Sequence, residues 1–324
     1  MPSAKRGSRV LEYALVFLIA VTLNFFLPRM MPGNPLVLLA GVDVGTMTPE
    51  ERQQVLERVG LDQPLWKQYL VYWRDLLRGD FGYSYRQKLP IKEMLAERLP
   101  WTLLITGSSL VLSGIVGIAL GAIAAWNHAR PVDAGSLWFM IWLNSLPSFW
   151  LGMLAIAVVA VRWRLLPSFG AVTPGVTLEG MEQLLDAAKH AILPIVTLSV
   201  LSVPGIFVTM RYSMLNVLGA DFVRTARAKG LKESTVLFRH VVRNALAPVI
   251  TILAIRLGFA FGGTVVIETV FSYPGLGRLI YEAVAGRDYP VLQAAFLVIT
   301  VAVLLSNLLA DLLYPLLDPR ARAR

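Results

Sequence analysis

The amino-acid sequence predicts an all-α, polytopic membrane protein. Of its 324 residues, 56% are hydrophobic and only 16% are charged, and the mean hydropathy is +0.62. Soluble domains carry about 25% charged residues. An apolar run of about 20 residues matches the ~30 Å hydrocarbon core of a bilayer. We expect six transmembrane helices, because the sequence contains six such runs: 10–27, 101–126, 137–161, 191–210, 245–271 and 291–317.

The first run, 10–27, follows Lys5, Arg6 and Arg9 and so has the charge pattern of a signal peptide. It ends in Phe-Phe-Leu-Pro rather than in the small residues of a cleavage site. We expect a retained transmembrane helix, with cleavage as the alternative.

Lysine and arginine gather on one side of the predicted spans. If the first helix starts inside, the cytoplasmic segments hold 14 Lys+Arg against four acids, and the opposite loop, 28–100, holds ten against nine. Cytoplasmic loops carry the basic excess. We therefore expect both termini inside, and we attribute the net charge of +9 to insertion topology rather than to nucleic-acid binding. The predicted cytoplasmic segments are 1–9, 127–136, 211–244 and 318–324.

The loop 28–100 is predicted to form an extracytoplasmic helical region. Its first helix has Thr48 as N-cap, Glu51 closing a capping box and Gly60 as a stop. A second helix is expected to start at Asp62 or Gln63 and to end at Gly79.

That second helix carries an apolar stripe with helical spacing. Its members are Leu65, Trp66, Tyr69, Leu70, Trp73 and Leu77. One interpretation is packing on neighbouring helices or on the membrane surface. The other is a docking platform for an extracytoplasmic partner.

Two pairs of glycines, Gly117 with Gly121 and Gly258 with Gly262, have the spacing that lets membrane helices approach closely. We expect them to support helix packing.

No enzyme motif is present. The sequence has no His-Glu-x-x-His, no Gly-x-Ser-x-Gly and no metal-ligand cluster, and its three histidines are scattered. It has no cysteine and no Gly-Lys dipeptide, so it holds no thiolate and no phosphate-binding P-loop. We expect no catalytic residue, no metal site and no cofactor on this chain. Any nucleotide energy would come from another polypeptide.

The longest predicted cytoplasmic segment, 211–244, contains the basic stretch "RTARAKGL" at 224–231. On a helix, Phe222, Val223, Ala226 and Gly230 share one face, and Arg224, Arg227 and Lys232 point elsewhere. Gly230 is suited to end that helix. The segment is either an amphipathic helix that meets a partner or a basic loop without one.

The stretch "DFVRTARAKGLKESTVLFRHVVRNALAPVI" resembles the coupling segment of ABC-transporter permeases, specifically the first permease subunit of the dipeptide/oligopeptide/nickel importer family. Further collinear stretches resemble the same family: "FLPRMMPGNPL", "GLDQPLWKQYLVYWRDLLRGDFGYS", "RLPWTLLIT", "ETVFSYPGLGRLIYEAVAGRDYPVLQA" and "LLYPLLDPR".

The resemblance implies a coupling helix that sits in a groove of an ATPase subunit. The implied contact residues are Phe222, Arg224, Ala226, Arg227, Lys229 and Gly230. The wider superfamily has Glu-Ala-Ala-x-x-x-Gly here. This sequence has Arg-Thr-Ala at 224–226 instead, so a role for that glutamate has no support.

The resemblance also implies the type I ABC importer permease fold, with a five-helix core at 101–317, in a bacterial or archaeal cytoplasmic (inner) membrane. The implied partners are a second homologous permease, two ATPase subunits that carry ATP and Mg, and an extracytoplasmic solute-binding protein. The implied cargo is a short peptide. Nickel complexes, glutathione and sugars are the alternatives within the family.

Four polar residues in the predicted spans are candidates for the translocation path, since such groups usually face a bundle interior or a water-filled path. They are Asn144, Ser148, Arg256 and Glu268. Pro147 frees a backbone carbonyl beside the first two. Arg256 lies about 16 Å from Ala245 along a helix, so we expect it to face protein or a cavity. For Glu268 the alternative is an interfacial position near the outer mouth.

A different class, the ATP-independent secondary transporters, needs titratable groups near mid-membrane. Arg256 is nearly the sole candidate, and an arginine does not deprotonate in proteins. A membrane-embedded hydrolase would need a nucleophile–base pair or a metal motif, and the sequence has neither. An ABC importer permease is the predicted function.

Overall fold

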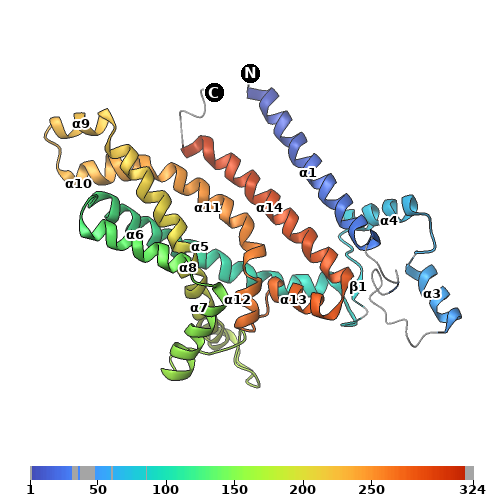
Figure 1. The fold of residues 1–324 in the computed structure, drawn as a ribbon. Coiled ribbons are helices and arrows are strands. Elements are labelled where there is room, and N and C mark those ends of the chain that lie inside the picture. Colours follow the sequence, from blue (N-terminus) through green and yellow to red (C-terminus); the bar gives the residue numbers. More distant parts are fainter. Residues whose placement is uncertain (1, 31–35, 37–47, 60, 85, 318–324) are drawn as a thin grey trace. The chain divides into compact units, whose positions relative to one another are not determined.

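The computed structural model describes residues 2–30, 36, 48–59, 61–84 and 86–317. These residues form helices and a two-stranded hairpin (Figure 1), in agreement with the predicted all-α class. The chain divides into two compact units, each built from two stretches of sequence. Unit 1 holds Met1–Thr102 and Pro274–Leu304, and unit 2 holds Leu103–Tyr273 and Leu305–Arg324.

Unit 1 contains the first helix and the loop that follows it. Its elements are α1 (Pro2–Met30), α3 (Pro49–Val59), α4 (Leu65–Leu77), β1 (Tyr83–Ser84), β2 (Leu89–Pro90), the start of α5 (Ile91–Trp126), α13 (Leu276–Gly286) and the start of α14 (Tyr289–Leu317). β1 and β2 are antiparallel, with Tyr83 opposite Pro90. Aliphatic side chains of α5, α13 and α14 form the core: Ile91, Met94, Leu95, Leu276, Leu279, Ile280, Ala283, Val291, Ala294 and Ala295.

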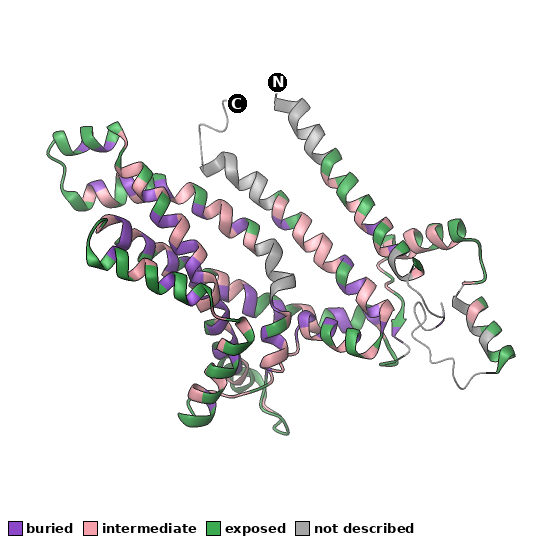
Figure 2. Cartoon of the chain, in the orientation of Figure 1, coloured by how far each residue is buried: buried purple, intermediate pink, exposed green. Residues whose placement is uncertain are grey.

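Unit 2 contains the longest helix and the predicted coupling segment. Its elements are the rest of α5, α6 (Pro131–Asn144), α7 (Ser148–Ala155), the π-helical η1 (Ile156–Arg162), α8 (Gly180–Leu218), α9 (Asp221–Ala228), α10 (Glu233–Thr235), the π-helical η2 (Val236–Val242), α11 (Arg243–Gly263), α12 (Val265–Val270) and the end of α14. Figure 2 shows that buried residues are frequent along α8 and sparse on α9. A core cluster joins α5, α8, α9, η2 and α11: Ala125, Ile206, Met210, Met214, Val223, Ala226, Val236, Val241, Ala245 and Val249.

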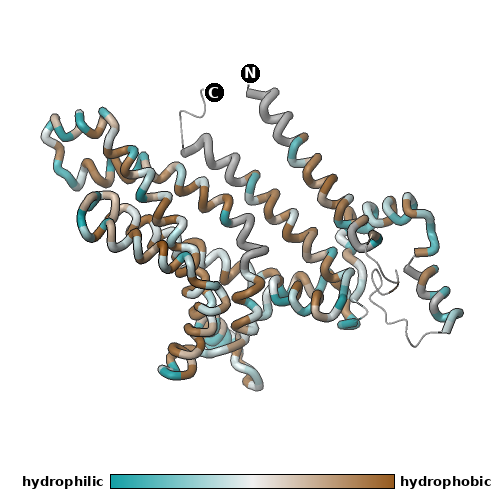
Figure 3. Tube along the Cα trace, in the orientation of Figure 1, coloured by the Kyte–Doolittle hydropathy of each residue, from teal (hydrophilic) through white to brown (hydrophobic). Residues whose placement is uncertain are grey.

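Four of the six predicted apolar runs lie within single helices, whereas 137–161 is interrupted at residues 145–147 and 245–271 at Thr264, between α11 and α12. Figure 3 shows the hydrophobic colour along much of α1 and α14. In the part of the chain that the structure describes, four helices are long and apolar enough to cross a bilayer: Ile91–Trp126, Gly180–Leu218, Glu233–Arg256 and Tyr289–Leu308. The bent pair of α6 with α7 and η1 passes the same test, and α1 contains a shorter apolar segment, Leu11–Phe26. Six spans therefore stay a prediction.

The third predicted run, 137–161, is not one straight helix. α6 ends at Asn144, α7 begins at Ser148, and their axes differ by 97°. Pro147 precedes α7 with an extended ψ of 136°. Proline lacks the N–H that a continuing helix needs and disfavours helical backbone in the residue before it. The expectation of a single continuous helix was therefore wrong here.

The predicted close packing at Gly117 and Gly121 is confirmed. A Cβ added at Gly117 would lie 2.8 Å from Ile206, and one added at Gly121 would lie 2.6 Å from the carbonyl oxygen of Phe207. Only glycine leaves room for α8 to lie this close to α5. The side chains around the second pair, Gly258 and Gly262, lie outside the described residues.

The predicted capping box of the loop is also confirmed. The Thr48 N–H donates to the Glu51 carboxylate at 2.8 Å, and the Glu51 N–H donates to the Thr48 hydroxyl at 3.3 Å. The predicted stop, Gly60, lies outside the described residues.

The second loop helix, α4, starts at Leu65 instead of at Asp62 or Gln63. Pro64 occupies the N-cap with an extended ψ of 145°, so the helix begins only after it. At the other end Gly79 has φ +70°. The N–H of Asp80 donates to the carbonyl of Asp75 at 2.9 Å. This is a Schellman termination, as Gly79 predicted.

Candidate functional site

The predicted coupling segment is a short helix, α9, followed by a tight turn. Asp221 in the first turn suits the positive end of the helix dipole. Gly230 has φ +74°, and an added Cβ there would meet no atom within 4 Å. The Leu231 N–H donates to the Ala226 carbonyl, which makes a second Schellman termination. Gly230 is therefore required for its backbone conformation, and the prediction that it ends the helix is confirmed.

One side of α9 is buried against its own chain. Val223 is fully buried and Ala226 is only 5% exposed, and both belong to the core cluster of unit 2. We expected Ala226 to face a partner groove; in this chain its side chain faces inward, and its contact with an ATPase stays a prediction. A helical period shows which residues share a face but not what that face contacts, and here it contacts α8, η2 and α11.

The other residues of α9 and of the turn that follows it are exposed. Phe222, Arg224, Lys229 and Gly230 are all exposed, and the Arg224 side chain lies 3.8 Å from Asp221. An exposed aromatic ring and exposed cationic side chains are suited to bind a groove with acidic rims. These side chains, unlike that of Ala226, are exposed on the permease chain.

Arg227 is bound within the chain. Its Nε and Nη2 donate to the two carboxylate oxygens of Glu233 at 3.1 and 3.3 Å, and its guanidinium lies 5.8 Å from the centre of the Trp126 ring. These contacts connect α9 to α10 and to the end of α5. Arg227 therefore braces the segment, whereas Arg224 and Lys229 extend outward.

A buried ion pair that the sequence analysis missed lies in the same unit. Arg211 of α8 donates to both oxygens of Asp133 of α6, at 2.5 and 2.8 Å, and the two residues are 7% and 3% exposed. His128 Nδ1 lies 2.9 Å from the same carboxylate. The sequence analysis placed Asp133 and Arg211 in the predicted cytoplasmic segments 127–136 and 211–244, where side chains are expected to be solvated. The available signal was that each lies beside an apolar run.

The first two path candidates, Asn144 and Ser148, lie on either side of the break between α6 and α7. Asn144 is exposed and Ser148 is half-buried. The Leu143 carbonyl accepts from the Leu146 N–H at 3.3 Å, and assignment of the two residues to the path stays a prediction.

The other two candidates, Arg256 and Glu268, occupy different surroundings. Arg256 is half-buried and donates to the Ser202 carbonyl on α8 at 3.2 Å, beside Gly205, where an added Cβ would collide with it. The expectation that it faces protein is confirmed. Glu268 is fully buried, and its assignment to the path stays a prediction. The structure brings Arg256 and α8 together and places Glu268 on the separate short helix α12.

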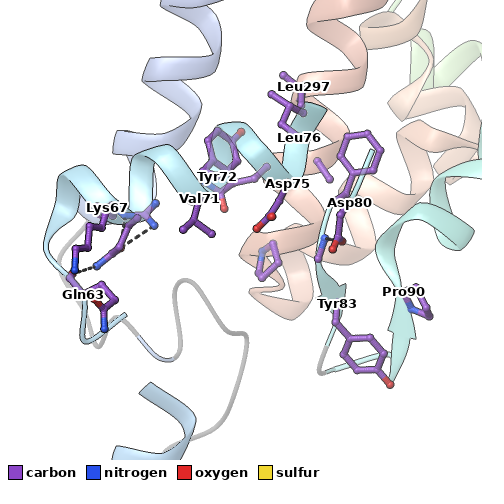
Figure 4. Close-up of a pocket in the computed structure, with 17 residues that line it drawn as sticks. Gln63, Lys67, Val71, Tyr72, Asp75, Leu76, Asp80, Tyr83, Pro90 and Leu297 are labelled. Carbon is purple, nitrogen blue, oxygen red and sulfur yellow. Dashed lines mark hydrogen bonds between the residues drawn. The ribbon is translucent and has the colours of Figure 1, made fainter. Parts of the chain in front are cut away.

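Unit 1 contains a cleft of about 560 Å³ between α4, the hairpin and α14. Figure 4 shows Lys67 and Gln63 at one side and Tyr83 and Pro90 at the other, with Asp75 and Asp80 between them. Arg29 also lines it. Burial lowers the pKa of Arg29 to about 10, and its guanidinium donates to Gln68 at 3.0 and 3.2 Å.

Comparisons with known proteins identify the family. Residues 117–323 match the binding-protein-dependent transport system inner membrane component, and residues 7–106 match the N-terminal domain of the corresponding membrane component. The dipeptide transport system permease protein DppB of Escherichia coli K12 is 37% identical over 317 residues, covering 93% of each chain. The chain belongs to this ABC importer permease family. As a member, the permease is a transport subunit of the inner membrane.

Other relatives and two solved structures agree. The oligopeptide permease AppB of Bacillus subtilis is 36% identical over 95% of this chain and 96% of its own length. The glutathione permease GsiC of Escherichia coli K12 is 39% identical over 95% and 94%. The methionine transporter MetNI in inward-facing conformations matches 69% of the permease and 96% of that chain, with TM-score 0.55 and 17% identity. An amino acid ABC transporter matches 68% and 93%, with TM-score 0.51 and 13% identity. At these identities the solved structures support the fold alone.

Proposed function

We propose that the permease forms, with a second homologous permease, the path by which short peptides enter the cell. The observation that carries this proposal is the identity of 36–39% to the dipeptide, oligopeptide and glutathione permeases over nearly the whole chain. Glutathione is itself a tripeptide, so a peptide backbone is the chemistry common to the three named cargoes. Nickel complexes and sugars remain the alternatives.

Energy enters through separate ATPase subunits, which carry ATP and Mg, and α9 is the element that receives it. The exposed side chains of Phe222, Arg224 and Lys229 dock on the ATPase, and the buried side chains of Val223 and Ala226 fix α9 to the core of unit 2. That core includes side chains of α8 and α11. A push on α9 therefore moves the helices that carry Ser202 and Arg256.

Arg227 and the turn at Gly230 keep this connection stiff. The Arg227–Glu233 pair joins α9 to α10, and the Schellman turn fixes the direction in which the chain leaves α9. A coupling element must transmit displacement without bending. The Arg227–Glu233 ion pair and the turn at Gly230 both restrict such bending. Closure of the ATPases would then favour one of two states of the paired permeases.

The proposed topology has both termini and α9 in the cytoplasm and the loop 28–100 outside, where a solute-binding protein delivers the cargo. The charge count supports it, with 14 Lys+Arg against four acids on the proposed inner side.

Transport by the reconstituted complex tests the proposal. The complete complex, made of the permease, the second permease, the ATPases and the binding protein, is reconstituted in liposomes. Uptake of a radiolabelled dipeptide and of a radiolabelled tripeptide is then measured with and without ATP on the side of the membrane that the ATPases face. ATP-dependent accumulation is expected, with none when the permease is omitted. Uptake of nickel or a sugar but of no peptide would move the assignment to another branch of the family. Uptake by this chain alone, driven by an ion gradient, would contradict it.

A further inference from the structure

The apolar stripe on α4 divides into two parts that face different surroundings. Tyr69 and Trp73 pack on α1: the Tyr69 ring lies 5.1 Å from Phe25, and the Trp73 ring lies 6.1 Å from Phe17. The other four residues are exposed: Leu65 by 55%, Trp66 by 62%, Leu70 by 59% and Leu77 by 80%. Packing on α1 therefore explains only two of the six residues of the stripe.

The contacts with α1 show how far α4 reaches along that helix. Near its start, Gln68 accepts hydrogen bonds from Arg29, and the next residue, Tyr69, is hydrogen-bonded to Thr22. One turn later, Trp73 contacts Phe17. The apolar segment of α1 is Leu11–Phe26. Along the helix, Phe17 lies about 14 Å from the Phe26 end of this segment, at about 1.5 Å per residue. α4 thus descends from the polar end of α1 into its apolar part.

A groove at the C-terminal end of α4 is also apolar. It has a volume of about 370 Å³ and is lined only by apolar side chains from α1, α4 and α14 and from the segment after α4. The lining residues are Phe17, Trp73, Leu76, Leu77, Phe81, Leu297, Val298 and Val301. Figure 4 shows Leu76 close to Leu297. The three α14 residues belong to the candidate span Tyr289–Leu308 and lie about 12–18 Å from its start.

We propose that α4 is embedded in the leaflet bordering the loop and that this groove holds an acyl chain of a phospholipid. Leu70 and Leu77 extend the apolar surface of α1 and α14 outward. They therefore contact the same surroundings as these predicted spans, which is the hydrocarbon of the bilayer. In water, each large apolar side chain left exposed would forgo the free energy of its burial. Trp66, nearer the polar end, is placed at the headgroups, where tryptophan is enriched.

The cationic residues of α4 fit a lipid headgroup. Lys67, near the start of α4, is exposed, Arg74 is 55% exposed and lies 2.9 Å from Asp75, and the exposed Arg78 follows directly after Leu77. Long cationic side chains bury their stems along apolar surface and extend their charge to the interface. The inference does not depend on the transported cargo.

Spin labels test the depth of α4. Because the native sequence has no cysteine, single cysteines at Trp66, Leu70 and Leu77 can each carry a nitroxide in the full-length permease in phospholipid nanodiscs. Gln53, exposed on α3, is the matched control. Collisions with oxygen and with a water-soluble nickel chelate are compared. We expect the oxygen preference to increase from residue 66 to 70 to 77, with residue 53 in water. Nickel accessibility at 70 and 77 equal to that at 53 would overturn the proposal, as would protection that appears only when the binding protein is added.

A second measurement addresses the groove. Leu77→Asp places a carboxylate at hydrocarbon depth on an exposed site, so folding is expected to survive, and Gln53→Asp is its control. Native mass spectrometry then counts the phospholipids that remain after delipidation. We expect Leu77→Asp to retain one phospholipid fewer than both the wild type and Gln53→Asp. Equal numbers in all three proteins would show that the groove holds no lipid.

Discussion

Arg211 of α8 and Asp133 of α6, 78 positions apart in the sequence, form a bidentate ion pair in the interior of unit 2. The pair fixes the start of α6 to the half of α8 that leads to α9. Since each charge is removed from water, each depends on the other. The pair therefore connects α6 to the helix that carries the coupling segment.

The first prediction concerns this pair. Asp133→Asn leaves the buried Arg211 cation without its carboxylate, and breaking one side of a buried pair costs about 3–5 kcal/mol. We expect a much lower melting temperature of the detergent-purified permease by fluorescence-detected gel filtration. The double variant Asp133→Leu with Arg211→Leu should recover most of the loss, because both charges are removed together. His128→Ala, at the exposed edge, should change little. A wild-type melting temperature for Asp133→Asn would refute the structural role.

The second prediction concerns the contact of α5 with α8. A Cβ at Gly121 would lie 2.6 Å from the Phe207 carbonyl, and one at Gly107, on the same helix, would meet nothing within 4 Å. Gly121→Ala must push the two backbones apart, which typically costs about 1–3 kcal/mol. Gly107→Ala should stabilise slightly through helix propensity. Melting temperatures of the two variants check this, and equal shifts in both would contradict the packing described.

The helices and their ends could largely be predicted from the sequence, because the signals are local. Apolar runs place every long helix, and the capping box at Thr48 and Glu51 marks the start of α3. Gly79 and Gly230 mark helix ends, because a positive φ is strained for other residues.

The sequence failed wherever the answer depended on tertiary contacts. The partner of Asp133 is 78 positions away, so no local pattern predicts the pair. Pro147 predicts a disturbance, but the 97° direction of the bend depends on what α7 packs against, and Val270 of α12 lies 3.1 Å from a Cβ added at Gly152. For α9, the helical period grouped Ala226 with Gly230, but only the structure shows that Ala226 faces inward.

The third prediction concerns topology. Thr48 and Ser234 are both exposed, and the native chain has no cysteine to compete for label. In intact cells, a membrane-impermeant maleimide should modify Thr48→Cys and leave Ser234→Cys unmodified until the membrane is permeabilised. Labelling is detected by a gel shift. The reverse pattern would place the loop 28–100 inside and the coupling segment outside.

The fourth prediction concerns Ala226. Its side chain is packed among Met214, Val236 and other core residues, so Ala226→Trp overfills a closed site. We expect less permease in the membrane, as well as loss of bound ATPases and uptake. Ala226→Ser, which adds a single atom, should be much milder. Normal abundance of Ala226→Trp together with loss of the ATPases would instead place Ala226 at the partner surface.

The last prediction concerns the exposed face of α9. Phe222 is 40% exposed, and interface aromatics often contribute 2 kcal/mol or more, equivalent to about 30-fold in affinity. Phe222→Ala should therefore leave permease abundance and pairing with the second permease unchanged, while ATPase affinity and peptide uptake decrease at least about tenfold. Phe238→Ala, an exposed aromatic on η2, is the matched control and should retain both. Affinity is measured by titrating labelled ATPase onto the permease pair in nanodiscs. If Phe222→Ala binds the ATPases as tightly as the wild type, α9 is a basic cytoplasmic loop without a partner, and the energy enters elsewhere.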